Sequence, residues 1–328
     1  MKKISVIVPV FNNEETILNC LQALINQNYP KEDFEILVVN DGSTDKTVPL
    51  IKKIQLKAKR KGFVLRIINL KHNEGRIIAR ETGAKQAKYS NLFFIDSRCL
   101  ADENILNELI KINYQPLICN INIDYSRSYF DRFNYLFRKK IYVSHYGQNF
   151  KPVFITKNNF DSIPKGIGAF FCNKKLFLDS SLKDKSKTSS DDPKLLWNIV
   201  LRKKILKCPE IKITYLSRVS FKKTLQQIYN RGLIFVDFYL SFKKQRFWLF
   251  IVLPLLILML TLYIVLFFRN FFFLWLTGAL IVWVSLSLWL AENIKDFIIS
   301  FLFLPLTGLS FELGILKGLL LKLCEKIK

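Results

Sequence analysis

Two aspartates in the first hundred residues come directly after short apolar runs. Asp41 follows residues 36–40 and precedes Gly42, and Asp96 follows residues 92–95. Such short, uncharged, β-branched or aromatic runs are typical of strands buried inside a parallel sheet. Open α/β sheets bind their ligands beyond the carboxyl ends of these strands. Each aspartate is therefore a candidate binding group, although the Asp41–Gly42 pair alone is equally compatible with an ordinary turn.

Strand and helix patterns alternate around these aspartates. Apolar runs predict four strands, and the segments between them predict helices of about a dozen residues. Asn12 and Glu15 have the spacing of a capping box and predict that the first helix begins there and continues to about Gln27. The predicted strands are residues 4–10, 34–40, 64–69 and 92–95. This order predicts an α/β fold with a doubly wound, mostly parallel sheet and right-handed crossovers.

The pattern becomes irregular between residues 124 and 159, which are rich in Tyr, Phe, Arg and Lys. A segment of this kind either covers a substrate or forms a long surface loop. Gly166 and Gly168 then precede another strand-like run. A helix is predicted from Pro193, because proline at the first turn needs no N–H partner, and Asp191 and Asp192 stand directly before it.

The last quarter of the chain is almost continuously apolar. Residues 247–268 and 271–290 contain no charge and would span about 33 and 30 Å as helices, close to the thickness of a bilayer core. They predict two membrane-spanning helices joined by a tight turn at residues 269–270. A buried hairpin in a soluble core is the alternative.

A third apolar segment, residues 297–316, contains Pro305, Gly308, Glu312 and Gly314 and leads into a Lys-rich amphipathic tail. A full crossing would export this tail if the preceding domain is cytoplasmic, against the positive-inside tendency. A re-entrant or interfacial segment is favoured, and a third crossing stays open. The predicted organisation is a catalytic domain at 1–220, a basic interfacial helix at 221–246 and a membrane region at 247–328.

Charge and cysteine usage restrict the function. The formal net charge is +24, but the Lys and Arg residues accompany no nucleic-acid-binding pattern, so anionic headgroups or phosphorylated substrates explain them better than nucleic acid. A base-composition bias is the remaining explanation. The six cysteines show no paired spacing and the chain has two histidines, which argues against zinc and for a reducing compartment. The N-terminus reads as a strand rather than a signal peptide.

Four motifs at successive strand ends resemble the inverting family 2 glycosyltransferases with the GT-A fold. They are PVFNNEE at residues 9–15, NDGSTDKT at 40–47, NEGRIIARETGA at 73–84 and FFIDS at 93–97. The resemblance implies a nucleotide-sugar donor, whose N–H groups and hydroxyls are bound by carboxylates through charge-assisted hydrogen bonds. The donor-side residues that it implies are Pro9, Glu14, Asp41, Arg80, Asp96 and Arg98. A solvated position for Arg80 is the alternative.

The same resemblance implies the residues on the acceptor side. Asp191–Asp192 is similar to the family's Glu–Asp pair, so Asp192 would take the proton of the acceptor hydroxyl. A purely helix-capping role for the two carboxylates stays open. Gly166 and Gly168 resemble part of an acceptor-side loop. Gln227 and Arg231 resemble a signature of processive synthases, but the spacing is one residue too long and the tryptophan is missing.

One departure from the family concerns the metal. The family usually has Asp-x-Asp after the fourth strand to hold Mg²⁺ or Mn²⁺ against the leaving diphosphate, whereas this chain has Asp96-Ser97-Arg98. Either Asp96 still holds a metal with help from the diphosphate, or Arg98 partly replaces it.

The sequence therefore predicts an integral membrane glycosyltransferase whose catalytic domain is cytoplasmic. It would transfer a sugar from a nucleotide-sugar donor to a lipid-linked or cell-surface glycan acceptor at the membrane, and would not bind nucleic acid. A polyprenyl phosphate acceptor is one alternative. A non-catalytic membrane-bound relative that lacks the second metal carboxylate is the other.

Overall fold

The computed structural model describes residues 2–142, 151–183, 191–217, 220–238, 240, 248–267 and 271–327. The chain divides into two compact units. Unit 1 comprises Met1–Asp124 and Tyr142–Ser217, and unit 2 comprises Tyr125–Ile141 and Arg218–Lys328. The chain therefore leaves unit 1 for one short segment and returns to it before the C-terminal part of unit 2 begins.

Unit 1 contains one mixed sheet, which has nine strands within the described residues. Its order is β3-β2-β1-β4-β8-β6-β9-β5, and β7 also pairs with β9. Strands β1 to β4 are mutually parallel, and β6 is parallel to β9, whereas β5, β7 and β8 run antiparallel to their neighbours. The strands are β1 Ile4–Val10, β2 Phe34–Asn40, β3 Val64–Asn69, β4 Asn91–Ile95, β5 Cys99–Ala101, β6 Leu117–Ile123, β7 Val153–Ile155, β8 Ala169–Asn173 and β9 Ile205–Tyr215. The predicted mostly parallel, doubly wound sheet is confirmed.

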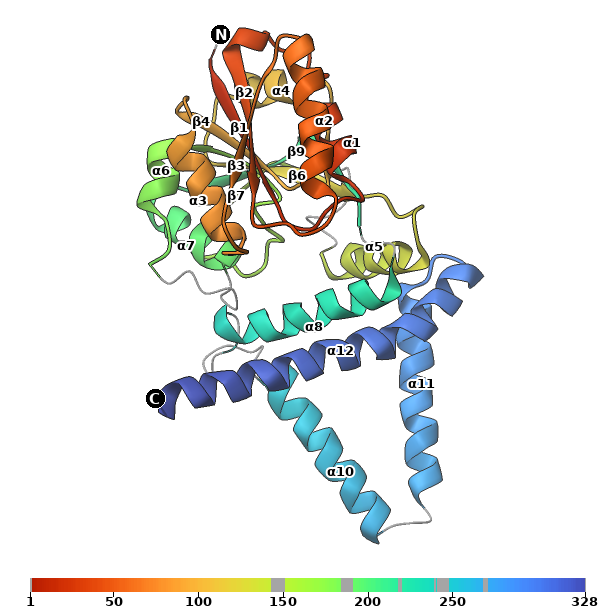
Figure 1. The fold of residues 1–328 in the computed structure, drawn as a ribbon. Helices are drawn as coiled ribbons and strands as arrows, with labels where there is room; N and C mark the ends of the chain where they lie inside the picture. Colours follow the sequence, from red (N-terminus) through yellow and green to blue (C-terminus); the bar gives the residue numbers. More distant parts are fainter. Residues whose placement is uncertain are drawn as a thin grey trace. The chain divides into compact units, whose positions relative to one another are not determined.

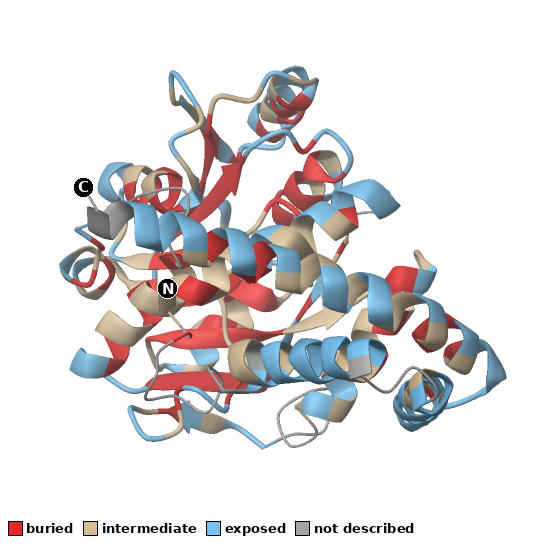
Figure 2. Ribbon diagram, turned by 90° about the horizontal axis from the view of Figure 1, so that it is seen from below, coloured by how far each residue is buried: buried red, intermediate tan, exposed pale blue. Residues whose placement is uncertain are grey.

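Helices cover both faces of this sheet (Figure 1). They are α1 Ile17–Leu24, the 3₁₀ turn η1 Lys31–Asp33, α2 Thr47–Arg60, α3 Arg76–Gln86, α4 Ile105–Ile112, α6 Lys174–Asp179 and α7 Asp191–Arg202. Alternate residues of β1 face opposite layers, because Val6 and Val8 pack with α1, α2 and α4 while Ile7 lies against Gly83 of α3. Both faces are apolar, so the central strands are buried along their whole length (Figure 2).

The predicted start of the first helix is wrong. Helix α1 begins at Ile17, and Asn12 does not cap it. Asn12 instead has a positive φ of 43°, and its side-chain Oδ1 accepts a hydrogen bond from the Thr44 N–H at 2.8 Å. The side chain thereby connects the loop after β1 to the loop after β2. The Asn12–Glu15 spacing was misleading because the N–H group of a residue distant in sequence, Thr44, donates to the Asn12 side chain.

Unit 2 is helical in its described parts. Its elements are α5 Tyr129–Ile141, α8 Phe221–Phe238, the π-helical turn η2 Trp248–Val252, α10 Leu253–Phe267, α11 Phe272–Leu290 and α12 Ile294–Ile327. Helix α5 lies inside the region whose sequence pattern is irregular, so that region is not a loop throughout. Helix α5 contributes Phe130 and Phe133 to an apolar cluster with Leu290 and Ile299.

Helices α8 and α12 pack backbone against backbone. A Cβ on Gly232 would lie 2.1 Å from the Phe311 carbonyl oxygen, and a Cβ on Gly314 would lie 2.0 Å from the Tyr229 carbonyl oxygen. Small residues that allow such close approach are frequent at helix contacts in membrane proteins. The third apolar segment of the sequence is therefore part of one long helix, α12. One side of this helix packs against α8.

Two described helices are long and apolar enough to cross a membrane, judged by length and composition alone: Phe272–Leu290 and Ile294–Cys324. Leu253–Leu266 is apolar but shorter. Residues 241–247 and 268–270 lie outside the described residues, so the end of the predicted interfacial helix and the predicted tight turn are not described.

Candidate active site

Asp41 lies at the carboxyl end of β2 and is buried. Its two carboxylate oxygens accept hydrogen bonds from the backbone N–H groups of Glu74 and Gly75, at 2.7 and 2.9 Å. Gly42 has a φ of +71°, and a Cβ there would lie 2.6 Å from the His72 carbonyl carbon, so the turn requires glycine. Asp41 thus fixes the segment that leads into α3, which is a structural role in addition to the predicted donor contact.

The loops after β1, β2 and β4 are joined by side-chain hydrogen bonds. The Asn13 side-chain amide donates to Ser97 Oγ at 2.7 Å, and the Asn13 backbone N–H donates to Thr47 Oγ1 at 2.8 Å. Glu14 accepts from the Lys46 N–H at 3.0 Å. These bonds hold the carboxyl ends of neighbouring strands in register, so the edge that carries Asp41 and Asp96 is rigid.

Arg80 connects the two carboxylates that matter most for the predicted chemistry. Its Nη1 donates to Asp192 Oδ1 at 2.6 Å and its Nη2 donates to Asp96 Oδ1 at 3.0 Å. The side chain is fully buried, whereas the side chains of Asp96 and Asp192 are 35% and 19% exposed. The solvated alternative for Arg80 is therefore wrong. The structure brings Arg80, Asp96 and Asp192 together, and we call them the site cluster.

Arg76, one helical turn before Arg80, binds the neighbouring carboxylate. Its Nε and Nη2 donate to Oδ2 and Oδ1 of Asp191 at 2.7 and 2.5 Å. The two carboxylates at the start of α7 thus face α3 and are not limited to capping their own helix. Sequence reasoning missed Arg76, although its spacing of four from Arg80 matches the adjacent Asp191 and Asp192.

Two opposing effects act on the Asp192 carboxyl group. Burial alone would raise its pKa, but the positive charges of Arg80 and then Arg76, with hydrogen bonds from Arg80 and the Ile167 N–H, outweigh burial and hold the pKa well below its usual range. Asp192 is therefore ionised at neutral pH, as the predicted role of proton acceptor requires.

The predicted acceptor-side loop lies against both carboxylates. The Ile167 N–H donates to Asp192 Oδ2 at 3.3 Å, and the Gly168 carbonyl accepts from the Asp96 N–H at 2.9 Å. A Cβ on Gly168 would lie 3.3 Å from Asp96 Oδ2, and one on Gly166 would lie 3.8 Å from Asp192 Oδ2. A side chain at Gly168 would crowd the Asp96 carboxylate, so the glycine keeps that oxygen accessible.

The described residues offer few ligands for the predicted metal ion. Among the described residues, no three His, Cys, Asp or Glu side chains cluster as metal ligands. Asp96 gives one oxygen to Arg80, and Arg98 lies with Nη1 3.6 Å from Glu15 Oε2. Mg²⁺ often binds through one or two carboxylates together with substrate phosphates. Asp96 fits that mode, in which the protein supplies a single carboxylate.

Three predicted residues remain to be placed. Pro9 is buried in β1, paired in register with Val39 of β2. Gln227 and Arg231 lie on α8 in unit 2, so the described contacts of unit 1 do not include them.

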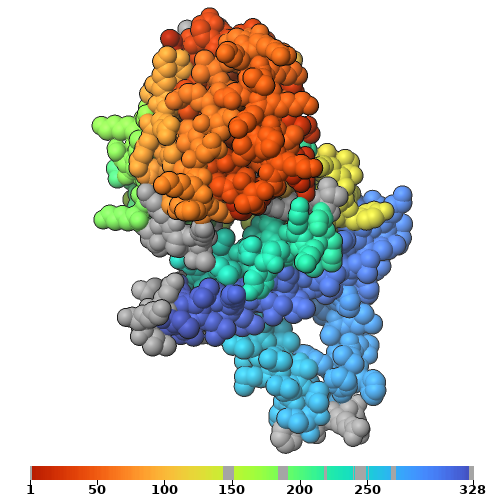
Figure 3. All heavy atoms as spheres, in the orientation of Figure 1, coloured from red at the N-terminus to blue at the C-terminus, as the bar shows by residue number. Residues whose placement is uncertain are grey.

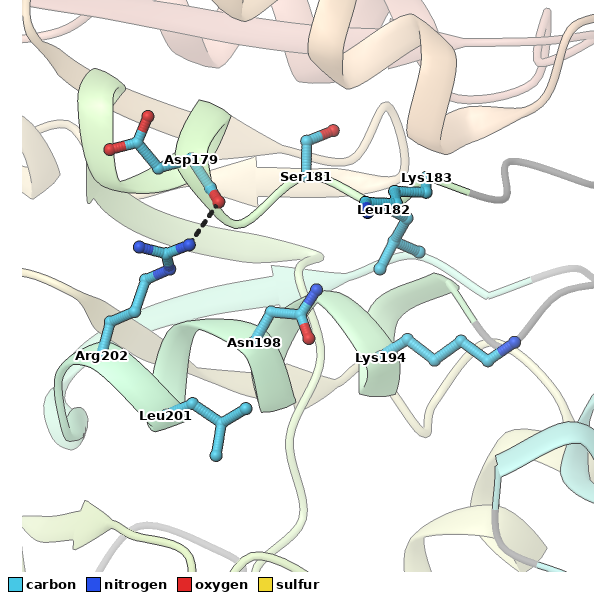
Figure 4. Close-up of a pocket in the computed structure, with 8 residues that line it drawn as sticks. All are labelled: Asp179, Ser181, Leu182, Lys183, Lys194, Asn198, Leu201 and Arg202. Atoms are coloured by element: carbon cyan, nitrogen blue, oxygen red, sulfur yellow. Dashed lines mark hydrogen bonds between the residues drawn. The ribbon is translucent and has the colours of Figure 1, made fainter.

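A separate cavity of about 510 Å³ lies between α7 and the segment after α6 (Figure 4). None of the predicted site residues lines it. Its walls are Asp179, Ser181, Leu182, Lys183, Lys194, Asn198, Leu201 and Arg202. Arg202 and Asn198 donate to the carbonyls of Asp179 and Ser180, so both side chains fasten α7 to the end of α6.

Comparison with known proteins agrees with this arrangement. Poly(ribitol-phosphate) beta-N-acetylglucosaminyltransferase TarP of Staphylococcus aureus is 38% identical over 112 residues, which is 33% of this chain and 32% of that protein. A dolichyl N-acetyl-alpha-D-glucosaminyl phosphate 3-beta-D-2,3-diacetamido-2,3-dideoxy-beta-D-glucuronosyltransferase of Methanococcus voltae is 33% identical over 117 residues, covering 36% of this chain and 35% of that protein. The matches thus span about a third of each relative.

Two solved structures share the fold. The mannosyltransferase PcManGT of Pyrobaculum calidifontis, in complex with GDP-Man and Mn²⁺, superposes with a TM-score of 0.64 at 16% identity and covers 97% of this chain and 87% of that one. S. aureus TarS 1–349 in complex with UDP-GlcNAc gives 0.51 at 20% identity, over 73% and 68%. The mixed α/β sheet is thus GT-A-like.

The model of the family described as "Glycosyl transferase family 2" matches residues 5–184, which include the strand-end loops, Arg80, Asp96 and the Gly166–Gly168 loop. This match covers more than half of the chain. The chain belongs to glycosyl transferase family 2.

Proposed function

We propose that this glycosyltransferase moves a sugar from a nucleoside diphosphate sugar to an acceptor hydroxyl with inversion at the anomeric carbon. The observation that carries the proposal is the site cluster, in which one buried arginine binds a carboxylate at a strand end and a second carboxylate on a facing helix. A single displacement needs both a group beside the leaving diphosphate and a base beside the nucleophile. In the proposal, Asp96 would lie on the side of the leaving diphosphate and Asp192 beside the nucleophile.

The step balances as follows. The acceptor oxygen forms a bond to the anomeric carbon while the bond from that carbon to the diphosphate oxygen breaks. The acceptor proton passes to Asp192, and the nucleoside diphosphate leaves as an anion. Arg80 would act on both the leaving diphosphate and the base, because an incoming diphosphate offers this arginine another anionic partner. As Arg80 turns toward the diphosphate, Asp192 loses its closest cation and becomes a stronger base.

The donor side is assigned to the rigid edge of the sheet. Asp41, Glu14 and the β1 segment around Pro9 would contact the nucleoside, and Asp96, Arg80 and Arg98 would face the ribose and diphosphate. The Glu74 and Gly75 N–H groups hold the Asp41 carboxylate at the carboxyl end of β2, where it would meet the nucleoside. The neighbours in complex with UDP-GlcNAc and GDP-Man support a uridine or guanosine diphosphate sugar.

A divalent metal is proposed as a helper of the leaving diphosphate. Mg²⁺ or Mn²⁺ would bind Asp96 and, when present, would neutralise charge on the departing phosphate. Arg98 would supply part of the positive charge that a metal bound by two aspartates supplies elsewhere in the family. Excess EDTA should therefore reduce turnover, and added Mn²⁺ should restore it; undiminished turnover in EDTA would remove the metal from the proposal.

The acceptor is proposed to be lipid-linked or a surface glycan. Relatives named for poly(ribitol-phosphate) and for a dolichyl phosphate sugar support this class. The Gly166–Gly168 loop would admit the acceptor hydroxyl to Asp192, and Gln227 and Arg231 would contact more distant parts of the acceptor. A polyprenyl phosphate acceptor is the variant to separate. That nucleophile is already ionised, so Asp192 would then matter little.

Helices α10 and α11 are proposed to anchor the enzyme in the membrane, with unit 1 in the cytoplasm. Both helices expose apolar side chains along their length, including Leu258, Ile281 and Val282. Such exposure is expected in lipid and costly in water. Within the chain, this would assign residues 1–220 to catalysis, except for Tyr125–Ile141, which belong to unit 2, with 221–246 at the membrane surface and 247–328 in the membrane.

A thermal-shift panel of nucleotide sugars, with and without Mn²⁺, tests the proposal. At least one donor should raise the melting temperature, since a ligand at 100 times its Kd stabilises a protein by about 2.7 kcal/mol. Turnover of that donor should follow. A donor that binds without any hydrolysis or transfer would favour the non-catalytic relative, and a panel without a single binder would overturn the donor site.

A further inference from the structure

Helix α12 presents a continuous row of exposed leucines, which we call the leucine stripe. The residues recur with alternating separations of four and three, so they share one face of the helix. Each is between 44% and 63% exposed. The stripe consists of Leu302, Leu306, Leu309, Leu313, Leu316, Leu320 and Leu323.

The other face of α12 packs against α8 and, near residues 299–303, against α5 and α11. Ile315 is completely buried there, Gly314 touches the Tyr229 backbone, and Ser310 Oγ donates to the Leu225 carbonyl at 2.9 Å. The helix therefore has one face committed to protein and one face of leucine that nothing in the described part of the chain covers.

The orientation of α12 within unit 2 argues against a crossing. Helix α12 runs crosswise to α11, which is seen end-on in the view where α12 is seen lengthwise (Figures 1 and 2). The corner between them is fixed by Trp283, which stacks on Phe301 at 4.3 Å and donates from Nε1 to its carbonyl at 3.0 Å. Two helices that cross in this way cannot both follow the bilayer normal.

Length leads to the same conclusion. The 19 residues of α11 span about 28 Å, which matches a hydrocarbon core of about 30 Å. The 34 residues of α12 span about 51 Å, well beyond the core. Helix α11 fits a crossing, and α12 fits a position along the surface.

The composition of the stripe's flanks identifies its partner. Between residues 297 and 321 the only charged residues are Glu312 and Lys317. A helix that pairs with a second copy through a leucine seam normally carries complementary charges beside the seam. Pro305 lies within this stretch as well, and proline is tolerated inside membrane helices. The apolar exposure also continues onto α10 and α11, which Figure 3 shows projecting from the α8–α12 layer with open space between them.

We propose that α12 lies flat in one leaflet, with the leucine stripe among the lipid acyl chains and α8 layered on its other side. Lys317 near its C-terminal end would reach anionic headgroups with its long side chain, whereas Lys322 donates to the Val236 carbonyl of α8 at 3.3 Å. The proposal uses the membrane anchoring proposed above and is independent of the transfer reaction.

Depth-resolved fluorescence quenching tests it on the full chain in phosphatidylcholine–phosphatidylglycerol vesicles. Cys324→Ser removes the exposed thiol, and the other five are buried. Single substitutions Leu306→Cys, Leu313→Cys and Leu320→Cys then carry a bimane label, and lipids carry a nitroxide at a shallow or a deep acyl position. Leu258→Cys in α10 is the deep reference, and Lys52→Cys on α2 is the aqueous control.

The proposal expects all three stripe positions to be quenched with the same preference for the shallow nitroxide. Leu258→Cys should prefer the deep nitroxide, and Lys52→Cys should be quenched by neither. A profile in which Leu313→Cys is deepest and the outer two positions are shallow would show a crossing and overturn the proposal. Absence of quenching at all three, with disulfide-linked dimers on oxidation, would assign the stripe to a second copy. If the Leu258→Cys label shows no preference for the deep nitroxide, the proposed membrane anchoring is contradicted. The transferase proposal is unaffected by this result.

Discussion

Two arginine–carboxylate clusters show how the same pairing serves different ends. In unit 1, Arg80 binds Asp96 and Asp192. In unit 2, Arg132 of α5 binds Asp296 at 2.6 and 2.8 Å and Glu292 at 2.8 Å. Both arginines bridge two acidic side chains that are distant in sequence, so ion pairing alone does not distinguish a site from a structural contact.

The two clusters differ in the other contacts that their arginines make. Arg132 also lies beside the Tyr125 and Tyr135 rings, whose centroids are each 5.3 Å from its guanidinium carbon, and Asp296 also accepts from the Asn293 side chain. By contrast, Arg80 is fully buried and its Nε has no hydrogen-bond partner within the described structure, whereas Arg132 keeps 19% of its side chain exposed. A buried donor without a partner beside a strand-end carboxylate has capacity for a ligand, and this feature distinguishes the Arg80 cluster.

The largest expected effect comes from Asp192→Asn. The substitution removes the proton acceptor, so turnover should fall by about 10²–10⁴-fold while donor affinity stays within a few-fold. Steady-state release of the nucleoside diphosphate, with donor binding measured by calorimetry, checks both. Asp191→Asn, which disturbs only the pairing with Arg76, is the matched control and should cost much less. Near-normal turnover of Asp192→Asn would remove the base assignment and favour an ionised phosphate acceptor.

Arg132→Met should instead affect stability. It leaves Asp296, which is 3% exposed, without its cation, and breaking such a pair costs about 2–4 kcal/mol. The unfolding midpoint in detergent should fall, and turnover per folded molecule should stay the same. Arg138→Met removes the same charge from the same helix, where no ion pair is described, and should change little. Equal losses in the two variants would mean that the cluster contributes no specific stability.

The pH dependence of turnover in Arg80→Gln tests whether Arg80 controls the pKa of Asp192. Because burial raises the pKa of Asp192 and Arg80 opposes it, removing Arg80 should raise that pKa. Asp192 must be ionised to accept a proton, so the acid limb of kcat/KM should move to higher pH, whatever the loss in amplitude. Arg76→Gln should move it in the same direction by less. An unchanged acid limb in Arg80→Gln would show that Arg80 does not tune the base.

The smallest effect is expected at an exposed pair on the same helix as Arg80. Lys85 lies 2.7 Å from Glu81 in an i,i+4 pair and is largely exposed. Lys85→Ala should therefore cost about 0.5 kcal/mol or less. Thermal unfolding and turnover should both stay near wild type. A large loss of turnover in Lys85→Ala would mean that the catalytic contacts extend well beyond the site cluster.

The strands and the acidic positions at their ends could be predicted because their signals are local. A short apolar run followed by Asp41 or Asp96 needs no knowledge of the rest of the chain. The pairing of Arg80 with Asp192 could not be read in this way, since it joins residues 112 positions apart. The sequence identified both residues and left open how each was used.

Helix α5 was missed for a different reason. Phe130, Phe133 and Leu136 are buried at separations of three, which is a helical signal. Tyr, Arg and Lys residues are interspersed among them and obscured the period. The capping-box prediction at Asn12 failed because a distant loop offered the asparagine a better partner. Long-range competition for polar groups therefore accounts for the main errors.

The anomeric configuration of the first transfer product tests the central claim most directly. An α-linked nucleotide sugar turned over by the wild-type chain and followed by proton NMR should give a β-linked product, because attack opposite the diphosphate with Asp192 as base inverts the centre. A product that keeps the α configuration would contradict a single displacement at the Arg80–Asp96–Asp192 cluster.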